Sequence, residues 1–242
     1  MDGVTKTSYL TVRYLQQTGR EVLIFAPDTA VPNVGPSEVV PLPSFSMPFA
    51  EETRVAVPHP LIARRIEAFK PDLIHLASPA AMGVSGMAMG RHLNIPVVAN
   101  YQTDLPGYAE RYGYPLLSRP MRHWLRYIHN GCHLTLVPTE KIRTELHSAG
   151  FRRLRLWRRG VNLHAFSPSY GSPRMRARLL AGRSAQSLLC IYVGRLATEK
   201  CVEQLREVAA EPGIALTIIG DGARREELEQ VFAGTDTLFT GY

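Results

Sequence analysis

Short apolar runs alternate with longer amphipathic stretches along this sequence, and this alternation restricts its fold more than any other feature. The apolar runs are nearly continuous, which is typical of parallel strands that are covered by helices on both faces. The expected strands are Glu21–Ala26, Asp72–Leu76, Ile95–Asn100, Leu134–Val137, Leu188–Val193, Ala215–Ile219 and Thr237–Thr240. The pattern therefore predicts an α/β fold with right-handed crossovers.

Amphipathic stretches fill the intervals between these strands. The expected helices are Thr5–Thr18, Pro60–Phe69, Pro79–His92, Arg119–Asn130, a helix capped by Thr139 that runs to Ser148, Glu199–Ala210 and Ala223–Phe232. Gly19 follows the first helix as a left-handed stop, and the Thr139 hydroxyl is suited to accept a bond from a first-turn amide.

A segment rich in Pro, Gly and Ser interrupts the rhythm between residues 161 and 186 and is typical of a linker. We place a boundary near Asn162–Ser172, which gives domains of residues 1–165 and 166–242. The first domain begins with a helix, whereas a doubly wound sheet has its first strand near its centre. We therefore expect a fragment without that strand and without the second half of the second domain.

Several classes of protein are disfavoured by composition. No run of about 18 apolar residues exists, so no segment is predicted to span a membrane. The three cysteines form no Cys-x-x-Cys pair, which argues against a disulfide framework or a zinc site. The N-terminus lacks the layout of a signal peptide, so we expect a cytoplasmic protein.

The positive charge of the chain is regional. Of its net charge of +7, residues 119–183 contribute 14 Lys and Arg against 2 Asp and Glu. Such a face suggests a polyanionic partner, namely a phosphate-bearing ligand, an anionic lipid or a nucleic acid. An Arg-rich surface that meets only water is the alternative.

One motif carries cations at the end of a predicted strand. The strand that reaches Val193 is followed by Gly194 and Arg195, and Lys200 comes at the start of the next helix. Ligands of α/β sheets bind at this edge, and helix N-terminal amides with two cations suit a diphosphate. The alternative is a glycine turn flanked by surface charges.

A second motif repeats this architecture. Gly220, Asp221 and Gly222 follow the strand that ends at Ile219, where glycines permit close approach of a ligand. The spacing is neither the dinucleotide-binding Gly-x-Gly-x-x-Gly pattern nor a P-loop. A tight turn into a helix is the alternative, and no nucleophile elbow supports a hydrolytic triad.

Together these motifs make the chain resemble the retaining nucleotide-sugar glycosyltransferases of family 4, with the GT-B fold of two Rossmann-like domains. The motifs that carry the resemblance are Asp2–Val4, Tyr101–Pro106, Thr135–Thr139, Arg159–Asn162, Phe166–Pro168, Val193–Arg195 with Lys200, Ile219–Gly222 and Phe239–Gly241. The segments 134–138, 156–162 and 225–229 look most like the sulfoquinovosyltransferases, which use UDP-sulfoquinovose and diacylglycerol. Phosphatidylinositol mannosyltransferases are also similar.

The resemblance implies a role for each motif. Arg195 and Lys200 would grip the donor diphosphate and stabilise it as it leaves, which makes them the expected catalytic residues. The residues expected on the donor side are Gly3, Gly194, Gly220, Asp221 and Gly222. Those expected on the acceptor side are His75, Tyr101, Gln102, Thr103 and Asp104. The basic pair replaces a metal ion and no Asp-x-Asp motif is present, so we expect no metal or cofactor besides the nucleotide-sugar substrate.

Two departures qualify this expectation. Gln102 stands where many relatives have His, and an amide hydrogen-bonds but does not exchange a proton. The family's Glu-x7-Glu segment, which holds the ribose and the donor sugar, would follow Tyr242. We therefore expect this chain to bind nucleotide sugar poorly. For His75 a strand-end hydrogen bond is the alternative role, and for Asp104 we favour a helix cap.

Basic and aromatic residues interleave between Pro106 and Asn130, as on a helix that meets an anionic membrane. The residues expected at that membrane are Arg119, Arg122, Trp124 and Arg126. In the alternative, Trp124 belongs to the core and the arginines are solvated. No nucleic-acid module is recognisable. The leading hypothesis is sugar transfer to a lipid acceptor at the inner face of the cell membrane, specifically sulfoquinovosyl transfer to diacylglycerol. Mannosyl or glucosyl transfer and a non-catalytic remnant or membrane-binding module are its alternatives.

Overall fold

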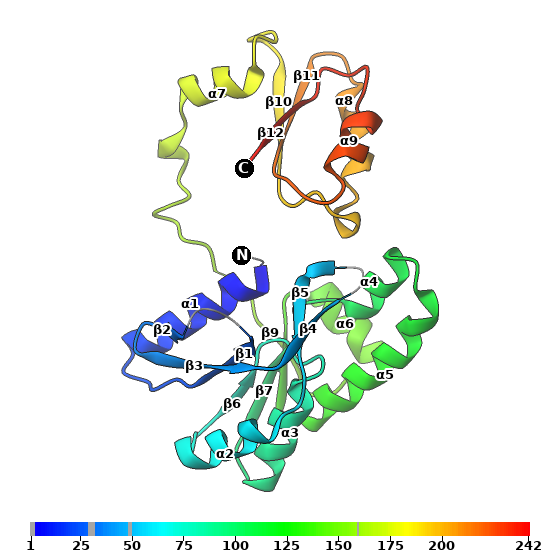
Figure 1. Cartoon of the computed structure of the whole chain (residues 1–242). Helices are drawn as coiled ribbons and strands as arrows, with labels where there is room; N and C mark the ends of the chain where they lie inside the picture. Colours follow the sequence, from blue (N-terminus) through cyan, green and yellow to red (C-terminus); the bar gives the residue numbers. More distant parts are fainter. Residues whose placement is uncertain (1–2, 29–31, 48–49, 159) are drawn as a thin grey trace. The chain divides into compact units, whose positions relative to one another are not determined.

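The computed structural model describes residues 3–28, 32–47, 50–158 and 160–242. These residues form two compact units, Met1–Gly160 and Val161–Tyr242, which are described separately (Figure 1). Asp2 of the first family motif and Arg159 of another lie outside the described residues.

The first unit is built around a parallel sheet. Its strands β6 (Ile74–Leu76), β7 (Val97–Asn100), β8 (Leu134–Val137) and β9 (Leu154–Leu156) are hydrogen-bonded in the order β6-β7-β8-β9. Three strands form a separate sheet in the order β1-β3-β2, namely β1 (Ile24–Pro27), β2 (Asn33–Val34) and β3 (Ser37–Leu42). The strands β4 (Ser44–Met47) and β5 (Ala50–Ala56) pair antiparallel. The expected α/β architecture is present, although the strands are divided among three sheets.

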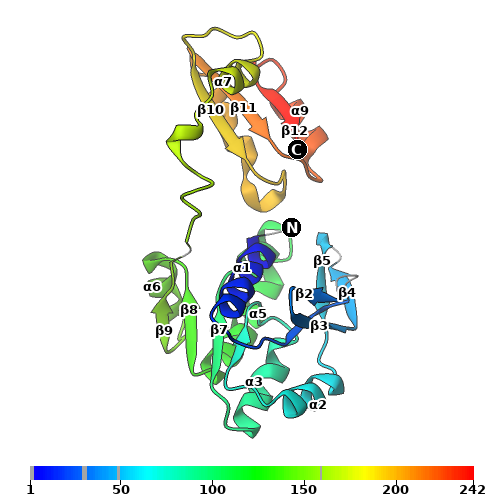
Figure 2. The ribbon, with the colours of Figure 1, turned by 90° about the vertical axis from the view of Figure 1, so that its left-hand side faces the viewer.

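Helices connect and cover these sheets (Figure 2). They are α1 (Gly3–Gln17), α2 (Pro60–Phe69), α3 (Gly83–His92), α4 (Leu105–Arg111), α5 (Pro115–Gly131) and α6 (Glu140–Ser148). α3 lies very close to the sheet, because a Cβ at Gly90 would come 2.1 Å from Val97 Cγ2 and one at Gly86 would come 2.6 Å from Leu76 Cδ2. This close contact explains why α3 is rich in glycine.

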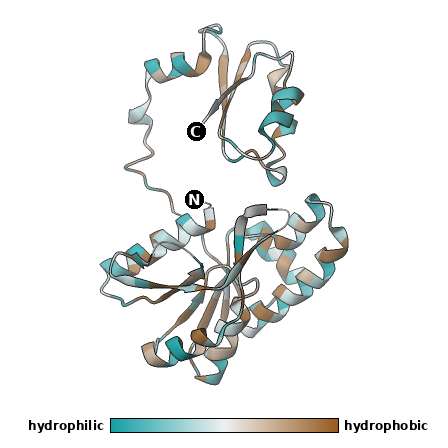
Figure 3. Cartoon of the chain, viewed as in Figure 1, coloured by the Kyte–Doolittle hydropathy of each residue, from teal (hydrophilic) through white to brown (hydrophobic). Residues whose placement is uncertain are grey.

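The second unit has a parallel sheet in the order β10-β11-β12, formed by β10 (Leu188–Val193), β11 (Ile214–Ile219) and β12 (Leu238–Gly241). It also contains α7 (Pro173–Leu180), α8 (Leu205–Ala209), α9 (Arg225–Val231) and the short 3₁₀ turns η1 (Pro168–Tyr170), η2 (Thr198–Lys200) and η3 (Val202–Gln204). The strands are mostly apolar and α9 is mostly hydrophilic (Figure 3). Leu196, Val202, Ile218 and Leu228 belong to its buried core.

One expected helix was wrong, and several strands were not predicted. The helix predicted over Glu199–Ala210 is divided into η2, η3 and α8, because Cys201 adopts a left-handed conformation with φ of 49°. The strands β2 to β5 were not expected, and in β3 the presence of Pro41 argues against a strand. The short strand β9 alternates Leu, Arg and Leu and was also missed.

Candidate functional site

The second unit gathers its cationic motif at the carboxyl edge of its sheet. β10 ends at Val193, and Gly194 and Arg195 follow it directly. The Tyr192 hydroxyl donates to the Arg195 carbonyl at 2.9 Å, and a Cβ at Gly194 would lie 2.8 Å from that hydroxyl. The tyrosine therefore braces the turn that carries Arg195. Burial, and to a smaller extent the Glu199 carboxylate, raises the pKa of this tyrosine, so it stays a neutral donor.

Arg195 forms an ion pair with a buried carboxylate. Its Nη2 lies 2.9 Å from Glu199 Oε1, and the Glu199 side chain is 2% exposed whereas that of Arg195 is 40% exposed. Glu199 was not predicted as a site residue, although its position four residues after Arg195 could have indicated an ion pair. Lys200, which follows Glu199 and ends η2, is exposed. The two predicted cations thus reach solvent near the end of β10.

The Gly220–Gly222 turn packs directly on the turn that carries Arg195. A Cβ at Gly220 would lie 1.9 Å from the Gly194 carbonyl oxygen, and one at Gly222 would lie 2.5 Å from the Leu196 carbonyl oxygen. The Leu196 amide also donates to the Asp221 carbonyl at 2.9 Å. The glycines were expected to admit a ligand, but the neighbour they admit here is backbone. Their contact with a donor stays a prediction.

Two other donor-side residues have local roles. One oxygen of the Asp221 carboxylate accepts from the Gly222 amide at 2.8 Å, and the other lies 3.7 Å from Arg225 Nη1. Asp221 therefore stabilises its own turn. Gly3 precedes the helix expected over Thr5–Thr18, but it is already the first residue of α1, and its carbonyl accepts from the Thr7 hydroxyl at 2.7 Å.

The first unit has a small pocket where β6 and β7 end. Segments 77–80 and 100–103 line it, together with Leu105, Leu125 and His129. Of the expected acceptor-side residues, Tyr101, Gln102 and Thr103 line this pocket. The Gln102 amide donates to the Ala77 carbonyl at 3.4 Å, which links the two strand ends. The carboxyl ends of β6 and β7 thus bring together three predicted residues.

The inner wall of this pocket is aromatic and uncharged. His129 is 1% exposed, and its ring lies 5.6 Å from Tyr101 and 5.7 Å from Phe151 between centroids. Its Nδ1 lies 3.0 Å from the buried Thr135 hydroxyl. Burial lowers the pKa of His129 to about 4, and burial with the nearby Asp104 carboxylate raises the pKa of Tyr101. Both rings are therefore neutral near pH 7. The sequence reading missed His129, which lies within a helix.

His75 and Asp104 stand beside the pocket residues. The His75 Nε2 lies 3.0 Å from Asn100 Oδ1, and the buried Asn100 lines the pocket, which fits the strand-end hydrogen bond considered for His75. Asp104 caps α4, since its carboxylate accepts from the Gly107 amide at 3.2 Å. The favoured role of Asp104 as a helix cap is confirmed.

The residues expected at a membrane divide into two kinds. Arg119 and Arg122 are exposed on α5. In contrast, the Trp124 indole donates to the Ala80 carbonyl at 2.7 Å, and Arg126 Nη1 donates to the Ala149 carbonyl at 3.2 Å. These two bonds fasten α5 to neighbouring segments. Trp124 is still 44% exposed and its ring stacks on Tyr127, so it is only partly buried.

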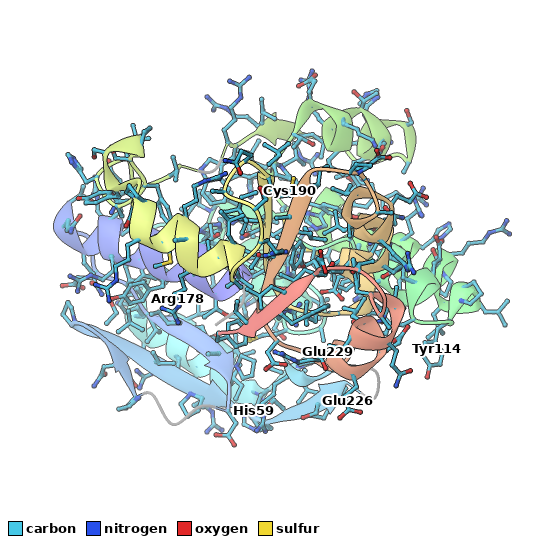
Figure 4. All side chains as sticks on the ribbon, turned by 90° about the horizontal axis from the view of Figure 1, so that it is seen from above. His59, Tyr114, Arg178, Cys190, Glu226 and Glu229 are labelled. Atoms are coloured by element: carbon cyan, nitrogen blue, oxygen red, sulfur yellow. The ribbon has the colours of Figure 1, made fainter. Side chains whose placement is uncertain are left out.

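Apolar side chains are exposed at the start of α5. Leu116 is 90% exposed, and Tyr114 and Leu117 are about half exposed. Tyr114 projects outward from the turn between α4 and α5 (Figure 4). This group, the α5 tip, was not predicted, and its exposure is visible only once the helix boundaries are known.

The described residues contain neither a metal-binding cluster nor a membrane-spanning helix. Within them, no three His, Cys, Asp or Glu side chains converge as they would around a metal ion. None of the helices in the described part is both long and apolar enough to cross a membrane.

The sequence is similar to several glycosyltransferases. It is 36% identical over 236 residues to the sulfoquinovosyl transferase SQD2 of Arabidopsis thaliana, covering 95% of this chain and 46% of that protein. It is 35% identical over 248 residues to a GDP-mannose-dependent alpha-mannosyltransferase of Mycobacterium tuberculosis, covering 100% of this chain and 64% of the mannosyltransferase. The chain therefore spans about half to two thirds of the length of these relatives.

The structure is similar to solved glycosyltransferase folds. The Anabaena protein HepE in complex with UDP and glucose matches with a TM-score of 0.66 at 18% identity, over 100% of this chain and 66% of HepE. Sucrose-phosphate synthase from Thermosynechococcus elongatus matches with a TM-score of 0.64 at 19% identity, over 96% of this chain and 64% of the synthase. These likenesses establish the α/β fold of the GT-B type.

The family model named Glycosyltransferase Family 4 matches residues 1–165, which is more than half of the chain. Relatives with about one third of their residues identical cover nearly all of it. The chain belongs to glycosyltransferase family 4.

Proposed function

We propose that this chain takes part in the transfer of a sugar from a nucleotide-diphosphate donor to a lipid acceptor, with retention of configuration. In this proposal, domain 166–242 binds the nucleotide sugar and domain 1–165 serves the acceptor. The observation that carries it is the turn after β10, where Arg195 and Lys200 follow the strand end within seven residues.

The donor diphosphate is the ligand that best suits this turn. Two cations reach solvent there, and the Arg195 guanidinium offers a planar fork of donors that fits phosphate oxygens. Negative charge grows on the leaving diphosphate during the reaction, so cations placed at this point stabilise the transition state more than the ground state. Glu199 holds the guanidinium in place and acts as a positioning residue.

For the transferred group we propose sulfoquinovose, carried by UDP and passed to diacylglycerol. The Arabidopsis relative is named for sulfoquinovosyl transfer and supports this choice. A mannosyl group carried by GDP is the second candidate, because the mycobacterial relative at nearly equal identity is named for it. A third relative, from Acholeplasma laidlawii, is 29% identical over 187 residues and is named as an alpha-monoglucosyldiacylglycerol synthase, which supports a lipid acceptor.

We propose that the acceptor binds at the pocket at the ends of β6 and β7, which Tyr101, Gln102 and Thr103 line. In this proposal the Gln102 amide would hydrogen-bond an acceptor hydroxyl, and the neutral rings of His129 and Tyr101 form the adjacent wall. We propose that the α5 tip, Tyr114, Leu116 and Leu117, enters the surface of an anionic membrane with Arg119 and Arg122 beside it. This attachment would keep the chain at the cytoplasmic face, where it meets its acceptor.

A transfer assay tests the proposal. The chain is incubated with UDP-sulfoquinovose or GDP-mannose and with vesicles of diacylglycerol or phosphatidylinositol, and glycolipid and released nucleoside diphosphate are measured. Product from the first pair supports sulfoquinovosyl transfer, and product from GDP-mannose supports the second candidate. Absence of both products, in a chain that still binds UDP, would favour a non-catalytic remnant.

A separate assay tests the membrane contact. Replacing Leu116 and Leu117 by serine should reduce binding to phosphatidylglycerol vesicles about tenfold, because two exposed apolar side chains lose their contact with lipid. Leu188, which is 65% exposed in the second unit, offers a matched control as Leu188→Ser. Equal binding by all three proteins would overturn the assignment of the α5 tip.

A further inference from the structure

The first unit has a second pocket, and this one is basic. Its lining residues are Arg91, His123, Arg126, Tyr127, Asn130 and Gly131. Arg91 is in the last turn of α3, which precedes β7, and the others are in the second half of α5, which precedes β8. Both pockets therefore draw residues from α5, but no residue lines both of them.

The elements that form this pocket contain no acidic residue. Neither α3 nor α5 includes Asp or Glu. The adjacent turn is attached through Asn130, whose side chain accepts from the Arg152 amide at 2.7 Å and donates to the Gly150 carbonyl at 2.9 Å. The sequence has no Asp or Glu from residue 146 to residue 198. The positive charge here is therefore not balanced by the segments that build the pocket.

The nearby cations that stabilise helix ends can be separated from those that do not. Arg153 Nε donates to the Cys132 carbonyl at 3.0 Å, and its Nη2 donates to the Asn130 carbonyl, which satisfies the C-terminus of α5. Arg126 Nη1 donates to the Ala149 carbonyl at the end of α6 and keeps its other N–H groups. Hydrogen bonds to helix-end carbonyls thus occupy Arg153 and part of Arg126. Arg91, in the last turn of α3, makes no such bond within the described residues.

Arg91 and His123 are placed to bind an anion. A Cβ at Gly131 would lie 1.9 Å from Met87 Sδ and 3.3 Å from Arg91 Nη2, so the glycine makes room for Met87 and the Arg91 guanidinium lies beside α5 at the same point. The His123 Nδ1 lies 2.8 Å from the Arg119 carbonyl, and because a carbonyl only accepts, Nδ1 is the donor and Nε2 remains for a ligand. In the part of the chain that the structure describes, no carboxylate lies within ion-pair distance of Arg91 or Arg126.

We propose that this pocket binds a phosphate ester. The guanidinium groups of Arg91 and Arg126 would donate to its oxygens, the imidazolium form of His123 would donate from Nε2, and the Tyr127 hydroxyl would complete the set. The same chemistry is offered by the headgroup of an anionic phospholipid and by a small soluble phosphate ester. The site is independent of the donor diphosphate, whose cations lie on the second unit.

Calorimetric titration of the chain with glycerol 3-phosphate tests the site. We expect saturable one-to-one binding that Arg91→Gln weakens about tenfold, because one charged hydrogen-bonding fork is lost. Arg64→Gln is the matched control, since Arg64 is exposed on α2 and its loss changes the net charge equally. The proposal is overturned if binding does not saturate, or if both variants weaken it to the same extent.

Vesicles identify the source of the phosphate. If the site takes a lipid headgroup, Arg91→Gln also weakens binding to phosphatidylglycerol vesicles and leaves binding to phosphatidylcholine vesicles unchanged. If it takes a soluble ester, the variant loses glycerol 3-phosphate binding and keeps vesicle binding. UDP binding should be the same in the variant and the original chain, so a failure here is distinguishable from a failure of the proposed function. Matching thermal unfolding of the two variants shows that both are folded.

Discussion

Replacing Arg195 with alanine tests how the cationic turn is built. The variant removes the guanidinium that lies 2.9 Å from Glu199 Oε1, and the Glu199 side chain is 2% exposed. Loss of one partner of a fully buried ion pair costs about 3–5 kcal/mol. Because Arg195 is 40% exposed, solvent already screens part of the attraction, and we expect a loss of about 2 kcal/mol. Urea unfolding measures this change in the free energy of unfolding.

The double variant separates stability from binding. When Glu199→Ala is added to Arg195→Ala, no buried carboxylate remains without the guanidinium, so most of the lost free energy of unfolding should return. UDP binding, measured by calorimetry, should stay lost in both variants because the cation itself is gone. The reasoning would be refuted if Arg195→Ala is as stable as the original chain, or if the double variant is less stable than Arg195→Ala.

Three further predictions concern the two units. Gly220→Ala should lower the free energy of unfolding by about 3 kcal/mol or more, because the new Cβ would lie 1.9 Å from the Gly194 carbonyl oxygen, and thermal unfolding measures the loss. Asp104→Ala should cost about 1 kcal/mol through the lost cap of α4, whereas Asp104→Asn should be nearly neutral in urea unfolding. Burial lowers the pKa of His129 from 6.5 to about 4, so the unfolded chain binds the additional proton between these pH values. Stability is then complete above pH 6.5 and falls by about 3 kcal/mol as the pH drops to 4, and His129→Gln should lack this slope in unfolding measured against pH.

The sequence carried enough information to predict most regular elements. β8 and β10 have the expected bounds, and α2 agrees as well, because a continuous apolar run or a Pro at the helix start is a local signal. The Thr139 cap of α6 is also as expected, with its hydroxyl accepting from the Ile142 amide at 3.2 Å. Such features depend on residues close together in the chain.

Features that depend on distant residues were harder to predict. The Glu199 side chain, on η2, is buried beside the turn that carries Arg195, and its burial depends on that packing. His129 lines the acceptor-side pocket, although it lies near the end of α5 and not next to β7 in the sequence. The glycines after β11 indicated close approach correctly, yet sequence alone does not tell a ligand from the backbone at Gly194. Trp124 and Arg126 likewise carry bonds to distant carbonyls that no local pattern reveals.

The central claim is that Arg195 and Lys200 hold the diphosphate of a nucleotide donor. The ³¹P spectrum of UDP, recorded as the chain is added, tests it most directly. We predict that the β-phosphate resonance shifts, that Lys200→Gln removes the shift, and that Lys141→Gln keeps it, since Lys141 is 84% exposed on α6 in the other unit. A spectrum without any shift, or one that shifts equally with Lys200→Gln, would contradict the claim.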